Sequence, residues 1–242
     1  MLSEKNWKLE SVLRLVVGLL VCQCVGALLL GLLRGSVDPK AAPTVGRMVV
    51  SFLSFQLITV GLVWRFLRDH QVGWLDGFGF RRDLPKAIGL GAVAVGLFLP
   101  IGWGLMNLSV SVMQKMGIEP SLQLAMLALK NSSSAMELIA MGVATIILAP
   151  IAEETLFRGV LYPVIKQYGF PRAALWGTSL VFALIHRNVA TFVPLLLLAL
   201  LLVWLYEKTD NLLAPIAAHA TFNAVNFAMF LLLKDVASKL PA

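Results

Sequence analysis

Uninterrupted apolar runs of about twenty residues recur through most of this 242-residue chain. A helical run of that length matches the roughly 30 Å hydrocarbon core of a bilayer. The runs are continuous rather than alternating in polarity, which excludes a membrane β-barrel. Composition points the same way, because 59% of the residues are hydrophobic and 14% are charged, against about 45–50% and 25% in soluble domains. The sequence therefore predicts an all-α polytopic membrane protein.

About seven transmembrane helices and a short interfacial helix are expected. The expected spans cover residues 9–33, 48–67, 87–108, 134–168, 171–186, 191–206 and 211–233. The amphipathic stretch 122–130 is too short to cross a bilayer and is expected at its interface. Gly169 and Pro171 mark the end of the fourth span and the start of the fifth. Residues 1–118 are expected to form a three-helix scaffold, and residues 119–242 a four-helix catalytic core, within one integrated membrane domain.

The basic residues indicate how the chain sits in its membrane. With seven spans and a cytoplasmic N-terminus, a modest excess of the 20 Lys and Arg residues falls on the inner side. The net charge of +7 is therefore assigned to topology and to anionic lipid. No basic tail or aromatic-interleaved basic patch indicates a nucleic-acid partner. The sequence predicts an integral protein of the cell membrane with its N-terminus in the cytoplasm.

Residues 146–158 place three charges directly after an apolar run. Ionisable side chains in hydrocarbon cost roughly 2.5–3.5 kcal/mol each on insertion scales, so they are rare there and usually functional. On a helix, Glu154 and Arg158 lie four residues apart on one face and are expected to form an ion pair. Glu153 points about 100° away from that face. Glu153 is therefore the carboxylate that the ion pair leaves available for a functional role. The alternative is that all three charges only mark the membrane boundary.

Two of the three histidines lie in apolar segments. Phe182 precedes His186 by one helical turn, and Asn223 follows His219 by one turn, so each pair shares a helix face. Taken singly, such residues more often bond a backbone carbonyl or bridge helices. Together with the charged run, they indicate a site.

Helix lengths allow the glutamate and both histidines to converge. A hairpin folded at the Gly169–Pro171 turn brings Glu153 and His186 to about the same depth, and His219 lies roughly 12 Å in from that side. Such a cavity favours hydrolysis: Glu153 acts as general base on a water positioned by His186. His219 and Asn223 donate hydrogen bonds to the developing oxyanion.

The remaining charged residues are expected to support this chemistry. The Glu154–Arg158 pair would fix the helix and orient Glu153. No serine or cysteine stands beside a histidine at helical spacing in this region, so a covalent nucleophile is not expected.

At these residues the chain resembles the CPBP intramembrane proteases, a family of CAAX prenyl endopeptidases, bacteriocin-processing enzymes and abortive-infection proteins. The family's motifs are EExxxR, FxxxH and HxxxN. They are matched in order by Glu153, Glu154 and Arg158, by Phe182 and His186, and by His219 and Asn223. The resemblance covers roughly residues 134–233.

The resemblance implies a hydrolase that cleaves a peptide bond near the membrane surface, a metal-independent glutamic intramembrane endopeptidase. In the family, the first glutamate and first histidine activate water, and the second histidine and the asparagine form the oxyanion site. It implies no cofactor. The implied partners are membrane lipid and a hydrophobic or lipidated peptide or protein substrate.

Two other readings of the same residues stay open. Glu153, His186 and His219 are residue types that could bind zinc with water as the fourth ligand, although the HExxH pattern is absent. Alternatively, the chain could be a non-catalytic membrane scaffold or immunity protein, or a proton-coupled carrier whose buried charges form a relay.

Overall fold

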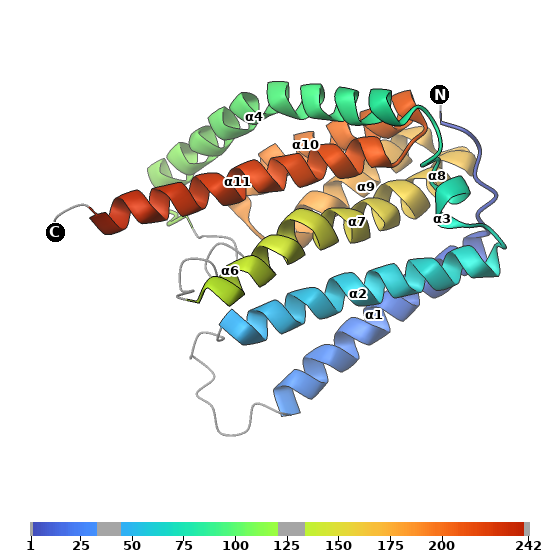
Figure 1. Cartoon of the computed structure of the whole chain (residues 1–242), viewed down its shortest axis with the longest axis horizontal. Coiled ribbons are helices and arrows are strands. Elements are labelled where there is room, and N and C mark those ends of the chain that lie inside the picture. The colour runs from blue at the N-terminus through green and yellow to red at the C-terminus, as the bar shows by residue number, and fades with distance from the viewer. Residues whose placement is uncertain (1, 33–44, 121–133, 240–242) are drawn as a thin grey trace.

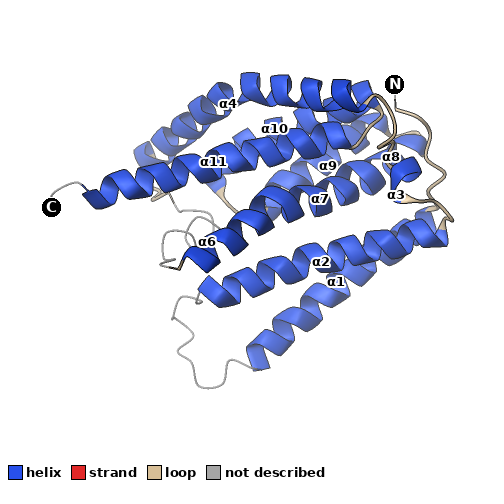
Figure 2. Ribbon diagram, in the orientation of Figure 1, coloured by secondary structure: helices blue, strands red, loops and turns tan. Residues whose placement is uncertain are grey.

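The computed structural model describes residues 2–32, 45–120 and 134–239, and every regular element in these ranges is helical (Figures 1 and 2). The longest helices are α1 (Leu9–Leu32), α2 (Val45–Asp69), α4 (Leu84–Lys115), α10 (Val189–Thr209) and α11 (Leu213–Lys239). The shorter ones are α3 (Trp74–Gly77) and α9 (Pro171–Ile185). Within the described residues, six helical segments are long and apolar enough to cross a membrane. The prediction of an all-α polytopic membrane protein is confirmed.

The fifth predicted span is shorter than the others. Helix α9 has 15 residues, or about 22 Å, less than the roughly 30 Å of a bilayer core. It ends early because Arg187 adopts a left-handed backbone conformation (φ 51°) and Asn188 starts α10 by accepting the Thr191 N–H at 3.1 Å. The bundle thus has six long helices plus this shorter apolar one. The expected interfacial helix at 122–130 lies outside the described residues.

The third predicted span is longer than expected. It was expected over residues 87–108, but α4 begins at Leu84 and continues to Lys115. Pro85 stands in its first turn, where the missing N–H costs nothing. Polar residues after position 108 therefore extend the helix instead of ending it.

The helix that carries the charged run is a composite of five segments. It comprises α6 (Ala135–Gly142), the π-helical η1 (Val143–Leu148), α7 (Ala149–Glu154), the π-helical η2 (Thr155–Leu161) and α8 (Tyr162–Gln167). Each π segment ends shortly before a proline, Pro150 or Pro163. Proline cannot donate the usual hydrogen bond and its ring crowds the carbonyl four residues back, so a wider turn relieves both problems. The helix thus accommodates both prolines through π-helical segments.

The composite helix ends where predicted. Gly169 has φ +88°, the left-handed conformation that glycine adopts without strain. Its N–H bonds the Lys166 carbonyl at 3.1 Å, and the Phe170 N–H bonds the Ile165 carbonyl at 3.3 Å. This pair of bonds is a Schellman motif. Pro171 then begins α9, so the chain reverses direction within three residues.

Helix α10 lies at the centre of the C-terminal half. It packs against α4 on one side and α9 on the other, and α11 covers α4 and α7. A buried apolar cluster that includes Phe98, Leu198 and Leu202 fills the space between these helices. Helix α2 packs along η1 and α7, and α1 lies outside α2 (Figure 1). The charged run therefore occupies the interior of the bundle.

The two ends of the chain lie at opposite ends of the bundle (Figure 1). The N-terminal segment crosses the end where α8 and α10 finish, and the Trp7 indole N–H donates to the Gly159 carbonyl at 2.9 Å. Helices of the first 118 residues pack directly against those of the remainder. The boundary near residue 118 and the cytoplasmic placement of the N-terminus stay predictions.

Candidate active site

Glu154 and Arg158 form the expected ion pair, fully inside the bundle. An Arg158 Nη1–H donates to Glu154 Oε1 at 2.9 Å, and the two side chains are 1% and 0% exposed. The pair spans the junction of α7 and η2. Arg158 also donates through Nη2 to the Ala199 carbonyl of α10 at 3.1 Å. A charge this deep is costly unless it is paired and hydrogen-bonded. The two charges are paired, but Glu154 Oε2 and Arg158 Nε have no hydrogen-bond partner among the described residues.

His219 of α11 binds the same carboxylate. Its Nδ1 lies 2.8 Å from Glu154 Oε1. An ionised carboxylate only accepts hydrogen bonds, so Nδ1 carries the hydrogen. The other ring nitrogen, Nε2, faces Glu153 and lies 4.0 Å from its Oε2. Glu154 thus aims the His219 ring at Glu153.

Glu153 takes no part in the Glu154–Arg158 ion pair, as expected. Its side chain is 11% exposed, and its buried Oε2 has no hydrogen-bond partner in the described part of the chain. A single water that hydrogen-bonds to two groups holds them about 4–4.5 Å apart, whichever of them donates. The separation between Glu153 Oε2 and His219 Nε2 fits that geometry.

Phe182 connects the charged groups with both histidines. It is fully buried, and the Arg158 guanidinium lies 4.5 Å above its ring centroid. The centroids of the His219 and His186 rings lie 5.7 and 4.9 Å from that of Phe182. Phe157 packs edge-on at 5.5 Å. The aromatic ring therefore supports Arg158 from α9 and separates the two imidazoles.

His186 is half-buried at the end of α9. Its Nδ1 lies 2.7 Å from the Phe182 carbonyl oxygen and donates to it, so that in a neutral ring the lone pair is on Nε2. The contact that joins His186 to the cluster is the one with the Phe182 ring. Its expected pairing with Glu153 stays a prediction.

Asn223 binds a backbone carbonyl of the composite helix. Its amide Nδ2 donates to the Thr145 carbonyl of η1 at 2.9 Å and so ties α11 to the composite helix. This is the helix-bridging contact that the sequence also allowed. The second amide N–H is left over after this bond. A role at an oxyanion stays a prediction.

The structure thus gathers Glu153, Glu154, Arg158, Phe182 and His219 into one cluster, with His186 and Asn223 at its edges. Among the described residues, no group of three or more His, Cys, Asp and Glu side chains is arranged to hold a metal ion. The three proposed zinc ligands do not come together as one centre.

Two contacts of the site could not be predicted from the sequence. The Ala199 carbonyl that binds Arg158 is a backbone atom in a uniformly apolar helix. The Glu154–His219 bond joins positions 65 residues apart, and helical spacing alone cannot assign His219 to one of two adjacent glutamates.

Fold and site together define a class: a polytopic helical membrane protein with a buried carboxylate–histidine centre. Residues 135–225 match the family model described as type II CAAX prenyl endopeptidase Rce1-like. This segment is similar to that family, which confirms the resemblance seen in the three motifs.

Two curated bacterial proteins are similar to parts of the chain. UPF0177 protein YxdF of Lactococcus lactis subsp. lactis (strain IL1403) is 28% identical over 96 residues, which are 39% of this chain and 52% of YxdF. Uncharacterized protein YpbD of Bacillus subtilis (strain 168) is 37% identical over 83 residues, which are 33% of this chain and 40% of YpbD. The chain thus spans about half the length of these curated relatives or less. No solved structure matches it significantly.

Proposed function

We propose that the chain is a metal-independent glutamic intramembrane endopeptidase that hydrolyses a peptide bond near the membrane surface. The observation that carries the proposal is the unpartnered Glu153 Oε2, 4.0 Å from a His219 ring that Glu154 holds in place. The match of residues 135–225 to a CAAX prenyl endopeptidase family supports the same reaction class.

In this mechanism Glu153 is the general base. A water donates one O–H to Glu153 Oε2 and the other to the free Nε2 lone pair of His186. As the water oxygen attacks the scissile carbonyl carbon, Glu153 takes a proton and the carbonyl oxygen becomes an oxyanion. Glu153 then returns the proton to the departing amine, and the C–N bond breaks to give a carboxylic acid and an amine.

The oxyanion is stabilised from α11. In its imidazolium form His219 donates Nδ1–H to Glu154 and has an Nε2–H to donate to the oxyanion. The second amide N–H of Asn223 donates to the same oxygen. This protonation state also balances the buried charges: two carboxylates, Glu153 and Glu154, face two cations, Arg158 and imidazolium His219. Such balance lowers the cost of burying them.

The substrate class follows from the location of the site. Glu153 and its partners lie among apolar helices, so a substrate reaches them most easily from the lipid phase. A hydrophobic or lipidated peptide or protein meets that requirement. The family's description as prenyl endopeptidases makes a prenylated C-terminal peptide the first one to try.

The decisive variant is Glu153→Gln, which keeps the shape of the side chain and removes the base. Terminal proteomics of cells that express the wild-type protein or this variant should show cleavage products only with the wild type. A purified, reconstituted enzyme should lose about 10²–10⁴-fold in cleavage rate, the usual contribution of a general base. Glu137→Gln, on the same composite helix and remote from the cluster, is the control and should retain activity.

Three outcomes would contradict the proposal. One is full cleavage by Glu153→Gln. Another is an absence of wild-type-dependent products, whether the peptides are prenylated or not. A third is loss of activity after treatment with a chelator with recovery on adding Zn²⁺, which would favour the zinc reading instead.

A further inference from the structure

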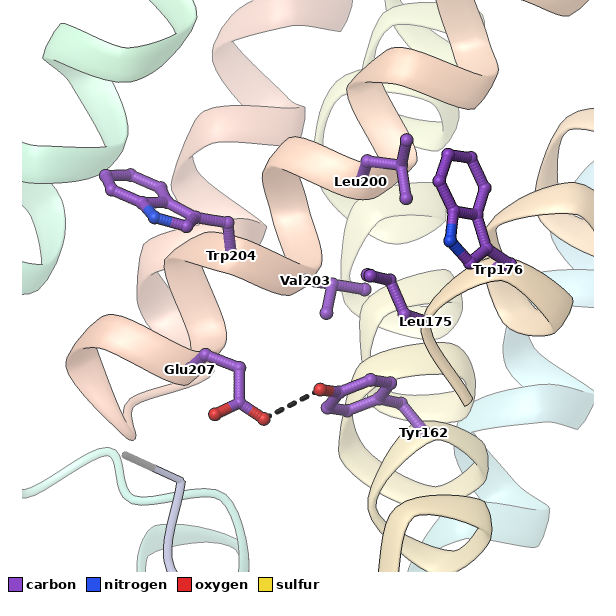
Figure 3. A pocket seen from close by; sticks show the side chains of 7 residues that line it. All are labelled: Tyr162, Leu175, Trp176, Leu200, Val203, Trp204 and Glu207. Atoms are coloured by element: carbon purple, nitrogen blue, oxygen red, sulfur yellow. Dashed lines mark hydrogen bonds between the residues drawn. The ribbon is translucent and has the colours of Figure 1, made fainter. Parts of the chain in front are cut away.

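An open groove lies between α8, α9 and α10, away from the glutamate–histidine cluster. Its volume is about 350 Å³, within the roughly 300–1,000 Å³ of small-molecule sites. In Figure 3, Trp176 of α9 and Trp204 of α10 stand on opposite sides of it, with leucine and valine side chains between them. Tyr162 and Glu207 close one end, joined by a hydrogen bond of 2.7 Å. The groove is thus apolar along most of its length and polar at one end.

The two tryptophans are placed alike. Trp176 lies five residues after the first residue of α9, and Trp204 five residues before the last residue of α10, so both are about 7.5 Å from the same end of the bundle. Both are about half exposed. Exposed indole rings at that level are typical of the belt where a membrane protein meets the lipid headgroups.

Each tryptophan has a basic residue one helical turn nearer that end. Arg172 precedes Trp176 by four residues and Lys208 follows Trp204 by four, so each pair shares a helix face. Both basic side chains are exposed. Lys166 lies at the same end and is paired with Glu207, the carboxylate that lines the groove. Three cations against one carboxylate leave a positive excess there.

A second hollow adjoins the first. Trp204 also lines a space of about 270 Å³ between α4 and α10, whose other lining residues include Leu97, Phe98 and Ile101. The indole of Trp204 therefore separates two apolar hollows.

We propose that this surface binds one anionic membrane phospholipid. One acyl chain lies in the groove between Trp176 and Trp204, and the other lies in the hollow on the far side of Trp204. The phosphate is held by Arg172 and Lys208. Anionic lipid is favoured over zwitterionic lipid because two exposed cations have no carboxylate partner among the residues that line the groove.

Tryptophan fluorescence tests this directly. The full chain is reconstituted in phosphatidylcholine nanodiscs that contain a small fraction of either brominated phosphatidylglycerol or brominated phosphatidylcholine. Bromine quenches indoles in contact with it. The chain has six tryptophans, so the signal of the groove is the difference between the wild type and a Trp176→Phe/Trp204→Phe variant. Brominated phosphatidylglycerol should quench that difference signal at lower mole fraction than brominated phosphatidylcholine.

The charge requirement is tested with paired variants. Arg172→Gln/Lys208→Gln should lower the preference for phosphatidylglycerol by about 25-fold, roughly fivefold for each cation near a lipid surface. The control Arg65→Gln/Arg68→Gln removes the same charge from exposed positions of α2, away from both hollows, and should leave the preference unchanged. Raised salt should weaken the wild-type preference without any substitution.

Either of two results overturns the proposal. One is equal quenching by the two brominated lipids in the wild type, which would make the groove ordinary lipid-facing surface. The other is an equal loss of preference in the paired variants and their control, which would assign the selectivity to overall charge.

Discussion

Removing Arg158 tests the buried centre most directly, because it leaves a carboxylate inside the bundle without its cation. Arg158→Met keeps an unbranched apolar stem in place of the aliphatic part of the side chain and deletes the charge. Glu154 would retain only the bond from His219 Nδ1, while its Oε2 already has no partner in the described residues. The substitution also removes the bond to the Ala199 carbonyl and the contact over the Phe182 ring.

The expected cost is about 3–5 kcal/mol in the free energy of unfolding, the usual result of removing one partner of a buried ion pair. Glu154→Gln should cost less, about 2–3 kcal/mol, because the amide oxygen still accepts from Arg158 and His219. The double variant removes both charges and keeps an acceptor for His219. It should therefore be more stable than the sum of the single variants predicts, by about 2 kcal/mol.

Equilibrium unfolding in mixed micelles with increasing SDS measures these differences. Glu10 and Arg14 supply the control, since they have the same i, i+4 spacing but are 75% and 70% exposed. Their coupling should stay within about 0.5 kcal/mol. The reasoning fails if Arg158→Met costs no more than Arg14→Met, or if the Glu154 and Arg158 substitutions are additive.

Two further predictions concern the packing of η2 and the charge of the buried Lys5. Gly159→Ala should destabilise the fold by about 1–3 kcal/mol in the same unfolding assay, because its Cβ would lie 2.6 Å from the fully buried Phe78 ring; Gly177→Ala, where nothing lies within 4 Å, should be neutral or slightly stabilising. Burial, with Arg82 nearby, lowers the pKa of Lys5 to about 8, below the value of about 10.4 expected in the unfolded chain. The unfolded state then binds more protons between these values, so stability should rise from pH 8 to pH 10, and Lys5→Met should abolish that rise.

Much of the fold follows from local signals in the sequence. The apolar runs place the long helices, and Gly169 with Pro171 places the reversal between α8 and α9, because each acts through backbone geometry within a few residues. The Glu154–Arg158 pair follows from i, i+4 spacing. The bounds of α9 agree with the prediction to within one residue. The expectation differed for α4, where the polar residues that follow the apolar run stay in the helix.

The hydrogen-bond partners within the site could be identified only from the structure. Helical spacing indicates that Glu153 and Glu154 diverge, but not which of them His219 meets. The answer depends on how α11 lies against α7, and that packing places Nδ1 on Glu154 and Nε2 toward Glu153. Asn223 shows the same limit, since its partner is a backbone carbonyl in η1. Contacts between residues that lie far apart in the sequence leave no short-range sequence pattern from which they could be predicted.

The N-terminal half carries none of the three motifs, yet it holds the segment that presents Arg158. Trp7 donates to the Gly159 carbonyl within η2. The Phe78 ring occupies the space that a side chain at position 159 would need. A π-helical turn has poorer local bonding than an α-helical one and persists where the surroundings favour it. We therefore infer that residues before position 118 set the geometry of the centre, so a C-terminal fragment that carries all three motifs would lack the contacts that hold η2.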